Sequence, residues 1–187
     1  MNKTNIYTTV VPVSVAMMIV GYYQCTRKIQ MGNLKVHFSS DKQTWETPQA
    51  FFDMLDAEFH FSLDVCATVW TAKCRRYFTK EDDGLSMEWS GVCWMNPPYG
   101  RDIGAWLAKA YQSTMSNDAT VVCLIPARTD TAWWHDYVMK ANEIRLVRGR
   151  LKFGGAKNSA PFPSAVVVFR PFSSPMGFEL MTQEEVA

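Results

Sequence analysis

Residues 92–99 run Val-Cys-Trp-Met-Asn-Pro-Pro-Tyr, an apolar segment that stops abruptly at two prolines. The apolar half is typical of a short buried strand. Each proline fixes its own φ near −65° and biases the residue before it toward an extended backbone, so the second half predicts a rigid loop. Asn96 would then follow the carboxyl end of a strand, which is where open α/β sheets bind their ligands.

This loop offers two fixed hydrogen-bond acceptors, the side-chain oxygen of Asn96 and the carbonyl of Pro97. Together they can accept both hydrogens of an amino group on a planar ring and turn its lone pair toward an electrophile. Such an amine is a poor nucleophile, so acceptors placed where positive charge develops favour the transition state. Tyr99 adds a flat face against which the ring could stack. The alternative is a Pro-Pro loop with Asn96 in an ordinary turn.

Strand and helix patterns alternate on both sides of this loop. The expected strands cover residues 61–67, 92–95, 120–126, 143–147 and 165–169. Four helices are expected. The first begins at Pro48 with Thr47 as its N-cap, the next two cover residues 72–77 and 103–115, and the last begins at Trp133. The run 120–126 is apolar throughout, which indicates a strand buried on both faces, as parallel sheets require. The alternation predicts an α/β sheet with helices on both faces.

One domain is expected over residues 31–172, which is long enough for its own core. The nearly uncharged segment 6–23 has three interpretations: a secretory signal, a membrane span, or upstream sequence translated from a misplaced start. It lacks the usual cleavage site and is marginal in length for a span, so we expect the true start at Met31 and no membrane anchor. Residues 173–187 lose periodicity and end acidic, which predicts a disordered tail.

The charge balance predicts only local contact with nucleic acid. The chain has 19 Lys and Arg against 18 Asp and Glu, and without the three cations of residues 1–30 the balance is 16 against 18. The basic cluster, residues 145–157, predicts either a solvated hairpin or a phosphate-contacting loop. The five cysteines, an odd number, indicate buried thiols in a reducing cytoplasm rather than disulfides or a zinc site.

Several acids are candidate ligand contacts. Asp64, at the end of the first strand, is either a turn former or an acceptor for an amine or hydroxyl of a bound cofactor. The acidic turn 81–83 is either a solvated loop or the source of a partner for a ribose hydroxyl or an adenine amine. Arg128, Asp130 and His135 would lie at the active-site edge if the strands are parallel. The sequence has no phosphate-binding P-loop, dinucleotide-binding fingerprint or Ser-His-Asp elbow.

Ordered motifs between about Thr44 and Phe169 resemble the phage-type DNA N6-adenine methyltransferase family. The motifs are Trp45-Glu46-Thr47-Pro48, Leu63-Asp64-Val65-Cys66-Ala67, Asp83-Gly84-Leu85 with Trp89, Asn96-Pro97-Pro98-Tyr99, Ile125-Pro126-Ala127-Arg128-Thr129-Asp130-Thr131 with Trp133-Trp134-His135, Gly149-Arg150-Leu151-Lys152-Phe153 and Pro161-Phe162-Pro163-Ser164. The resemblance implies the class I S-adenosylmethionine-dependent (Rossmann-like) fold, a mostly parallel seven-stranded sheet with one antiparallel strand. It also implies a phage or prophage protein in the cytoplasm of a bacterial host.

The activity implied is direct transfer of the methyl group of S-adenosyl-L-methionine to the exocyclic amine of a flipped adenine in double-stranded DNA, with no metal. The resemblance assigns catalysis to Asn96, Pro97, Pro98 and Tyr99. It assigns cofactor binding to Trp45, Thr47, Pro48, Asp64, Cys66, Ala67, Asp83 and Asn96. The expected DNA contacts are Arg101, Arg128, Arg148, Arg150 and Lys152.

One departure concerns the first cofactor loop, in which methyltransferases commonly have glycines. Residues 67–72 contain none, which motivates the alternative of a DNA-binding module without cofactor activity. A second alternative is methylation of an adenine in RNA or of a glutamine amide in protein, because each presents an amino group on a planar group. Sequence specificity is expected to rest on residues 100–104 and 145–157.

Overall fold

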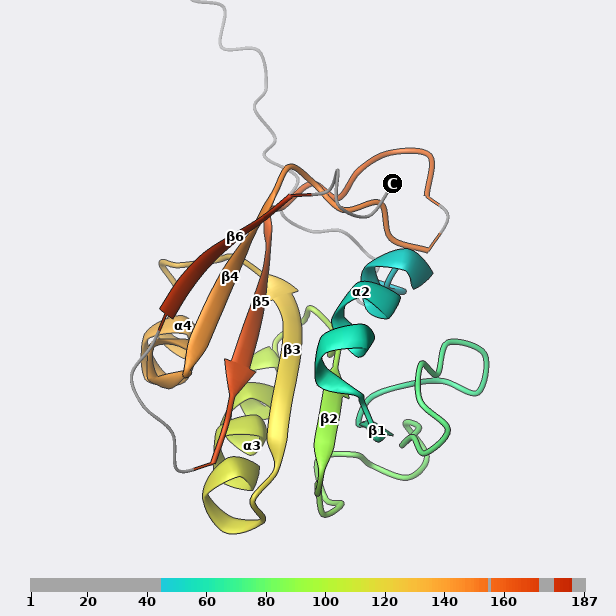
Figure 1. Cartoon of the computed structure of the whole chain (residues 1–187), viewed down its shortest axis with the longest axis vertical. Coiled ribbons are helices and arrows are strands. Elements are labelled where there is room, and N and C mark those ends of the chain that lie inside the picture. The colour runs from blue at the N-terminus through green and yellow to red at the C-terminus, as the bar shows by residue number, and fades with distance from the viewer. Residues whose placement is uncertain (1–44, 155, 172–176, 183–187) are drawn as a thin grey trace, which may run out of the picture. The chain divides into compact units, whose positions relative to one another are not determined.

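A computed structural model describes residues 45–154 and 156–171 (Figure 1). It also describes the backbone of residues 177–182. The expectations for residues 1–30 and for a start at Met31 lie outside these ranges. The described elements are α2 (Gln49–Phe59), β1 (Leu63–Asp64), β2 (Val92–Met95), α3 (Ile103–Ser116), β3 (Thr120–Pro126), α4 (Ala132–Asp136), η2 (Val138–Lys140), β4 (Glu143–Arg148), β5 (Ser164–Phe169) and β6 (Gly177–Thr182).

The six described strands form one sheet in the order β1-β2-β3-β5-β4-β6. β1, β2 and β3 are parallel neighbours, β5 is antiparallel to both β3 and β4, and β6 is parallel to β4. The carboxyl ends of every strand except β5 therefore lie at one edge, which we call the carboxyl edge. The predicted mostly parallel sheet with one antiparallel strand is confirmed, and the described residues supply six of the seven strands that the resemblance implies.

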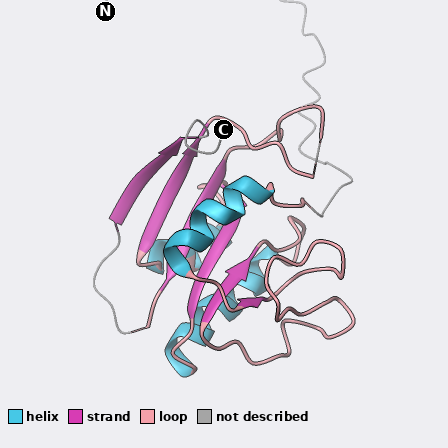
Figure 2. Ribbon diagram, turned by 45° about the vertical axis from the view of Figure 1, so that its right-hand side comes forward, coloured by secondary structure: helices cyan, strands magenta, loops and turns pink. Residues whose placement is uncertain are grey.

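Helices cover both faces of the sheet, as predicted: α2 lies on one face, and α3 and α4 lie on the other (Figures 1 and 2). The central strands β3 and β5 are buried along almost their whole length, which agrees with their uninterrupted apolar sequence. In α2 the buried side chains Phe51, Phe52 and Leu55 form one apolar stripe toward the sheet. None of the described helices is long and apolar enough to cross a membrane.

The predicted helix over residues 72–77 is wrong. Tyr77 forms a parallel bridge with Asp64, the Asp64 amide donates to the Arg76 carbonyl, and the Phe78 amide donates to the Asp64 carbonyl. The segment bends back beside β1 and satisfies backbone groups on its otherwise open side, the kind of edge that folded proteins cover.

Two further expectations are corrected at the ends of elements. Thr47 does not cap α2: the helix begins at Gln49 with Pro48 at the N-cap and no side-chain cap, and the Thr47 hydroxyl is used elsewhere. The segment 173–187, expected to be a disordered tail, contains β6 over residues 177–182, paired in register with β4.

Candidate active site

A cavity of about 620 Å³ lies at the carboxyl edge, beyond the ends of β1 and β2. Four parts of the chain contribute to its wall, together with Trp106 of α3. They are residues 45–47 before α2, residues between 64 and 84 in and after β1, residues 94 and 96–98 around the end of β2, and residues 153, 154 and 156 after β4.

The Asn96 side chain is tethered from both sides. Its Nδ2 donates to the Trp45 carbonyl and, over 3.0 Å, to Thr47 Oγ1. Its Oδ1 accepts a hydrogen bond of 2.8 Å from the Tyr99 hydroxyl. A carbonyl oxygen has two lone pairs, so Oδ1 keeps the capacity to accept one more hydrogen bond. The side chain is therefore fixed in the cavity wall with one acceptor position still available.

Tyr99 supports this arrangement from below the cavity surface. Its ring is only 9% exposed and meets the rings of Phe153 and Phe162 edge-on. Burial raises the pKa of its hydroxyl well above the ordinary value, so the group stays protonated, and its single hydrogen is shared between Asn96 Oδ1 and the Leu124 carbonyl. Tyr99 is not part of the cavity wall, and this arrangement does not support the predicted stacking of its ring against a ligand.

Asp64 is a buried carboxylate in the cavity wall. Burial raises its pKa from 3.8 to about 6, although its oxygens accept the backbone amides of Lys73 over 3.0 Å and Cys66 over 3.3 Å. Removing a carboxylate from water disfavours its charged form, and these two amides offset only part of that effect.

Among the three acids of the turn 81–83, only Asp83 belongs to the wall. Asp82 is turned back on its own loop, where the amide and hydroxyl of Thr79 both donate to its carboxylate over 2.8 Å and lower its pKa. Asp83 adopts a left-handed backbone conformation with φ of 51°. Because Asp83 lies in the wall, it is a better candidate for the predicted cofactor contact than Glu81 or Asp82.

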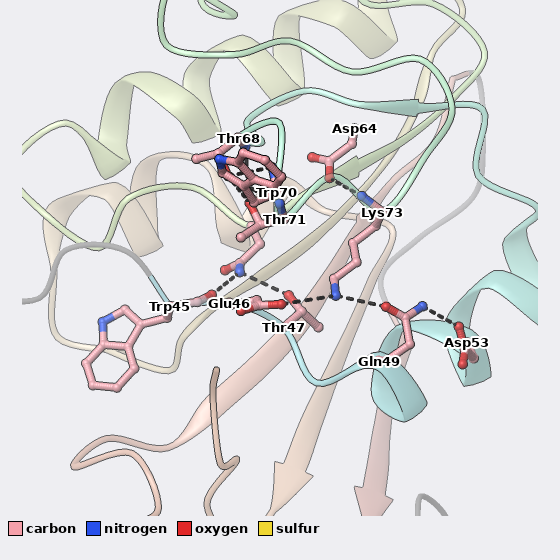
Figure 3. Close-up of polar contacts among 11 residues, drawn as sticks. Trp45, Glu46, Thr47, Gln49, Asp53, Asp64, Thr68, Trp70, Thr71 and Lys73 are labelled. Atoms are coloured by element: carbon pink, nitrogen blue, oxygen red, sulfur yellow. Dashed lines mark hydrogen bonds and ion pairs between the residues drawn. The ribbon is translucent and has the colours of Figure 1, made fainter. Parts of the chain in front are cut away.

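Lys73 is a wall residue that belongs to none of the sequence motifs. Its side chain is 8% exposed, and its Nζ lies 2.9 Å from Gln49 Oε1 and 3.8 Å from Glu46 Oε1 (Figure 3). Its place depends on the return of the chain alongside β1, which residue spacing does not reveal. Other wall residues that were not predicted are Thr79, Lys80, Gly84, Trp94, Trp106, Phe153, Gly154 and Ala156, whereas Glu46, Thr68 and Thr71 belong to the predicted segment 45–48 and to the first cofactor loop.

The loop that lacks glycine is held by threonine hydroxyls instead. Thr68 Oγ1 and Thr71 Oγ1 lie 2.8 Å apart, and the amides of Thr68 and Trp70 donate to Thr71 Oγ1 and Thr68 Oγ1 (Figure 3). The Ala72 amide also donates to the Thr68 carbonyl. These bonds satisfy the backbone of a tight turn, and the cavity exists without a glycine in this loop.

The predicted site residues divide into two groups. In the wall lie Trp45, Thr47, Asp64, Cys66, Ala67, Asp83, Asn96, Pro97 and Pro98, whereas Pro48 and Tyr99 do not line it. Cys66 is half-buried as a residue, and burial of its thiol raises the pKa of that group well above the ordinary value and keeps it protonated. Asp130 and His135 are exposed and also lie outside the wall.

The residues predicted to bind DNA all follow strands that end at the carboxyl edge. Arg101 follows β2, Arg128 follows β3, and Arg148, Arg150 and Lys152 lie at or after the end of β4. Arg145 differs from the rest of the basic cluster because it is buried and its guanidinium is paired with Glu58 and Glu143. The ion pair of Arg145 with Glu58 therefore has a structural role, because it joins β4 to α2.

Residues 35–186 match a family model described as DNA N-6-adenine-methyltransferase (Dam). A DNA N-6-adenine-methyltransferase of Haemophilus phage HP1 (strain HP1c1) is 33% identical over 141 residues, which cover 71% of this chain and 81% of that protein. A protein of the same name from Escherichia phage T1 is 29% identical over 114 residues, covering 59% of this chain and about half, 47%, of that relative. Among solved structures, a predicted O-methyltransferase from Agrobacterium tumefaciens superposes with a TM-score of 0.35 at 18% identity, over 59% of this chain and 48% of that one.

Proposed function

The chain belongs to the DNA N-6-adenine-methyltransferase (Dam) family, and from this premise we propose how it methylates DNA. It is an adenine-specific DNA methyltransferase that moves the methyl group of S-adenosyl-L-methionine directly to the exocyclic amine of an adenine turned out of the duplex. The observation that carries this proposal is the tethered amide of Asn96 beside Pro97 and Pro98 in the wall of the cavity.

The cavity suits the cofactor in size and in chemistry. A volume of about 620 Å³ lies within the usual range for small-molecule sites. Asp83 and Asp64 would accept hydrogen bonds from the hydroxyl and amino groups of the cofactor, and Lys73 would attract its carboxylate. The indole N–H of Trp45 is buried without a partner among the described residues, so a ligand acceptor would satisfy it. When bound, the cofactor supplies an activated methyl group on its sulfonium sulfur.

The rigid corner at residues 96–98 would hold the target base. Asn96 Oδ1 and the Pro97 carbonyl would accept the two hydrogens of the adenine amine, and Tyr99 would keep Asn96 oriented. These acceptors strengthen as positive charge develops on the nitrogen, which favours the transition state. Removing the adenine from the duplex costs a few kcal/mol, which contacts in the cavity offset.

The cations at the carboxyl edge, of which Arg128 is half-buried and the others are exposed, would bind the DNA backbone. Arg101, Arg128, Arg148, Arg150 and Lys152 form no ion pair within the described part of the chain. Cations without protein partners are available to neutralise phosphates, which is the main source of affinity for duplex DNA.

The decisive variant is Asn96→Ala, with Asn117→Ala as a matched control at the far end of α3, where the side-chain amide donates to the Trp89 carbonyl. We expect Asn96→Ala to lower methyl transfer to unmethylated DNA by about 100-fold or more, as loss of one preorganised transition-state contact does. Binding of S-adenosylhomocysteine, measured by calorimetry, should change little. Equal loss of binding and turnover would mean that Asn96 serves the fold and not the chemistry.

The same transfer assay separates the alternative functions. Labelled S-adenosylmethionine is offered with unmethylated DNA, with RNA and with total protein, and we expect label in DNA alone. Label in RNA or in a glutamine side chain would show that RNA or protein, and not DNA, is the substrate. Absence of both transfer and heat of S-adenosylhomocysteine binding would favour a DNA-binding module without cofactor activity.

A further inference from the structure

Trp70 is the most exposed large apolar side chain of the described residues. It is 92% exposed, and its neighbour Val69 is 64% exposed. All seven tryptophans of the chain lie in the described ranges, and the other six are buried or half-buried. Tryptophan carries a large apolar surface, so a protein gains by burying it, either in its core or against a partner.

The backbone that carries Trp70 is fixed at the rim of the cavity. Thr68 and Thr71, on either side, both line the cavity, and their hydroxyls are hydrogen-bonded to each other and to the backbone of the turn (Figure 3). The Trp70 amide is one of the donors in this network. Trp70 itself is not among the residues that line the cavity, and its side chain is almost wholly exposed beside the rim.

We propose that Trp70 stacks on a nucleobase of the bound DNA, next to the adenine that enters the cavity. This inference rests on the proposed function, which brings a duplex to the rim of the cavity and opens its stack there. Removal of one base exposes the faces of its neighbours, and an aromatic ring binds any base because every base has a π-face.

The cations of the carboxyl edge favour DNA as the partner, whereas the cavity wall itself holds the acids Glu46, Asp64 and Asp83 beside Lys73 and Lys80. Lys80, in the same wall as Thr68 and Thr71, is exposed and has no ion pair in the described ranges. The carboxyl edge also carries cations after β2, β3 and β4 that form no ion pair with any other described residue. An aromatic side chain set among cations is the usual composition of a surface that binds nucleic acid.

The test compares Trp70→Ala with Met115→Ala, since Met115 is 64% exposed and lies at the carboxyl-terminal end of α3, away from the cavity. Methyl transfer is measured on unmethylated plasmid DNA over a range of DNA concentrations. We expect Trp70→Ala to raise the KM for DNA about tenfold, which is within the range for one base–aromatic stack, and Trp70→Phe to restore most of the loss. Met115→Ala should match the wild type.

Calorimetry with S-adenosylhomocysteine in the absence of DNA separates a DNA contact from a cover over the cofactor. We expect the same affinity for wild type and Trp70→Ala, and a tenfold loss in the variant would overturn the inference. An unchanged KM for DNA in Trp70→Ala would also overturn it, while leaving the proposed function intact. A wild-type protein that transfers no methyl group to DNA would instead refute the proposed function.

Discussion

Asp64 is the carboxylate whose surroundings oppose its charge most clearly. Its pKa is raised from 3.8 to about 6 by burial, so the folded protein holds this proton more tightly than the unfolded chain does. Protonation of Asp64 therefore contributes stability that is complete below pH 3.8 and is lost as the pH rises through about 6. In the neutral range the ionised carboxylate lowers the free energy of unfolding.

Asp64→Asn removes this dependence on pH. We expect the free energy of unfolding of the variant, relative to wild type, to rise by about 2 kcal/mol between pH 4 and pH 7.5. Urea unfolding of both proteins at the two pH values measures it. The asparagine side chain of this variant would accept weaker hydrogen bonds from the backbone N–H groups of Cys66 and Lys73 than the carboxylate does. The resulting loss of stability is the same at both pH values and cancels in the comparison. A constant difference would show that Asp64 does not carry the raised pKa.

Tyr99 acts in our proposal through Asn96, so removal of its hydroxyl alone is informative. We expect Tyr99→Phe to lower kcat for DNA methylation about tenfold with little change in KM, and to lower the free energy of unfolding by about 1 kcal/mol. Tyr111→Phe is the matched control, because its hydroxyl forms no hydrogen bond within the described residues. A rise in KM alone would point to a direct contact between Tyr99 and the base.

Individual site residues were predictable where they belong to a motif with its own geometry. Asn96, Pro97 and Pro98 line the cavity because the prolines force a corner directly after β2. Lys73 could not be found this way, since it reaches the wall only when the chain turns back beside β1. Tyr99 adjoins the prolines in sequence, but its side chain packs under the corner, which the order of residues does not specify.

At the scale of elements, the cavity depends on a close approach between β1 and the acidic turn. A Cβ added to Gly84 would lie 2.3 Å from the Val65 carbonyl oxygen, which belongs to the backbone and cannot rotate away. We therefore expect Gly84→Ala to lower the free energy of unfolding by about 3 kcal/mol, as overpacking against a fixed group does.

Gly104→Ala is the matched control for this prediction. Gly104 lies in α3, where an added Cβ would meet only the Trp133 Cβ at 3.5 Å, an ordinary contact. Since alanine is favoured over glycine in a helix, this variant should be unchanged or more stable by up to about 1 kcal/mol. Urea unfolding of the two variants checks both, and equal midpoints would contradict the packing argument.

The elements with strong periodicity were predicted correctly. The errors concern segments whose structure is determined by pairing with an edge strand of the sheet. α3 and β3 follow directly from their apolar spacing. Residues 72–77 look helical by composition, but the open side of β1 binds their backbone. β6 has no comparable sequence pattern, and its pairing with β4 comes from an edge that the sequence does not reveal.

For the molecule as a whole, we predict that the carboxyl edge carries the DNA. Replacing Arg148, Arg150 and Lys152 together by Gln should make the slope of log K against log salt shallower by about 3, because each lost phosphate contact reduces it by about 1. The control is Lys140→Gln, which removes a charge before β4, at the opposite edge of the sheet. Equal slopes for the triple variant and wild type would exclude these cations from the interface.

The parallel order of the sheet was predictable because buried strands alternate with helices, and this order gathers the loops at one edge. The enclosure of the cavity was not, because it depends on contacts between segments that are far apart in the chain. The Gly154 amide donates to the Glu46 carbonyl, and Arg145 joins β4 to Glu58 of α2.

The tether of Asn96 to Trp45 and Thr47 spans 51 and 49 positions of the chain. No local segment can hold this amide in place alone, so it keeps its orientation only while the segment before α2 remains docked on the end of β2. Catalytic competence should therefore be lost together with tertiary structure on heating, so that residual turnover and the near-ultraviolet circular dichroism of the aromatic residues follow a single thermal curve.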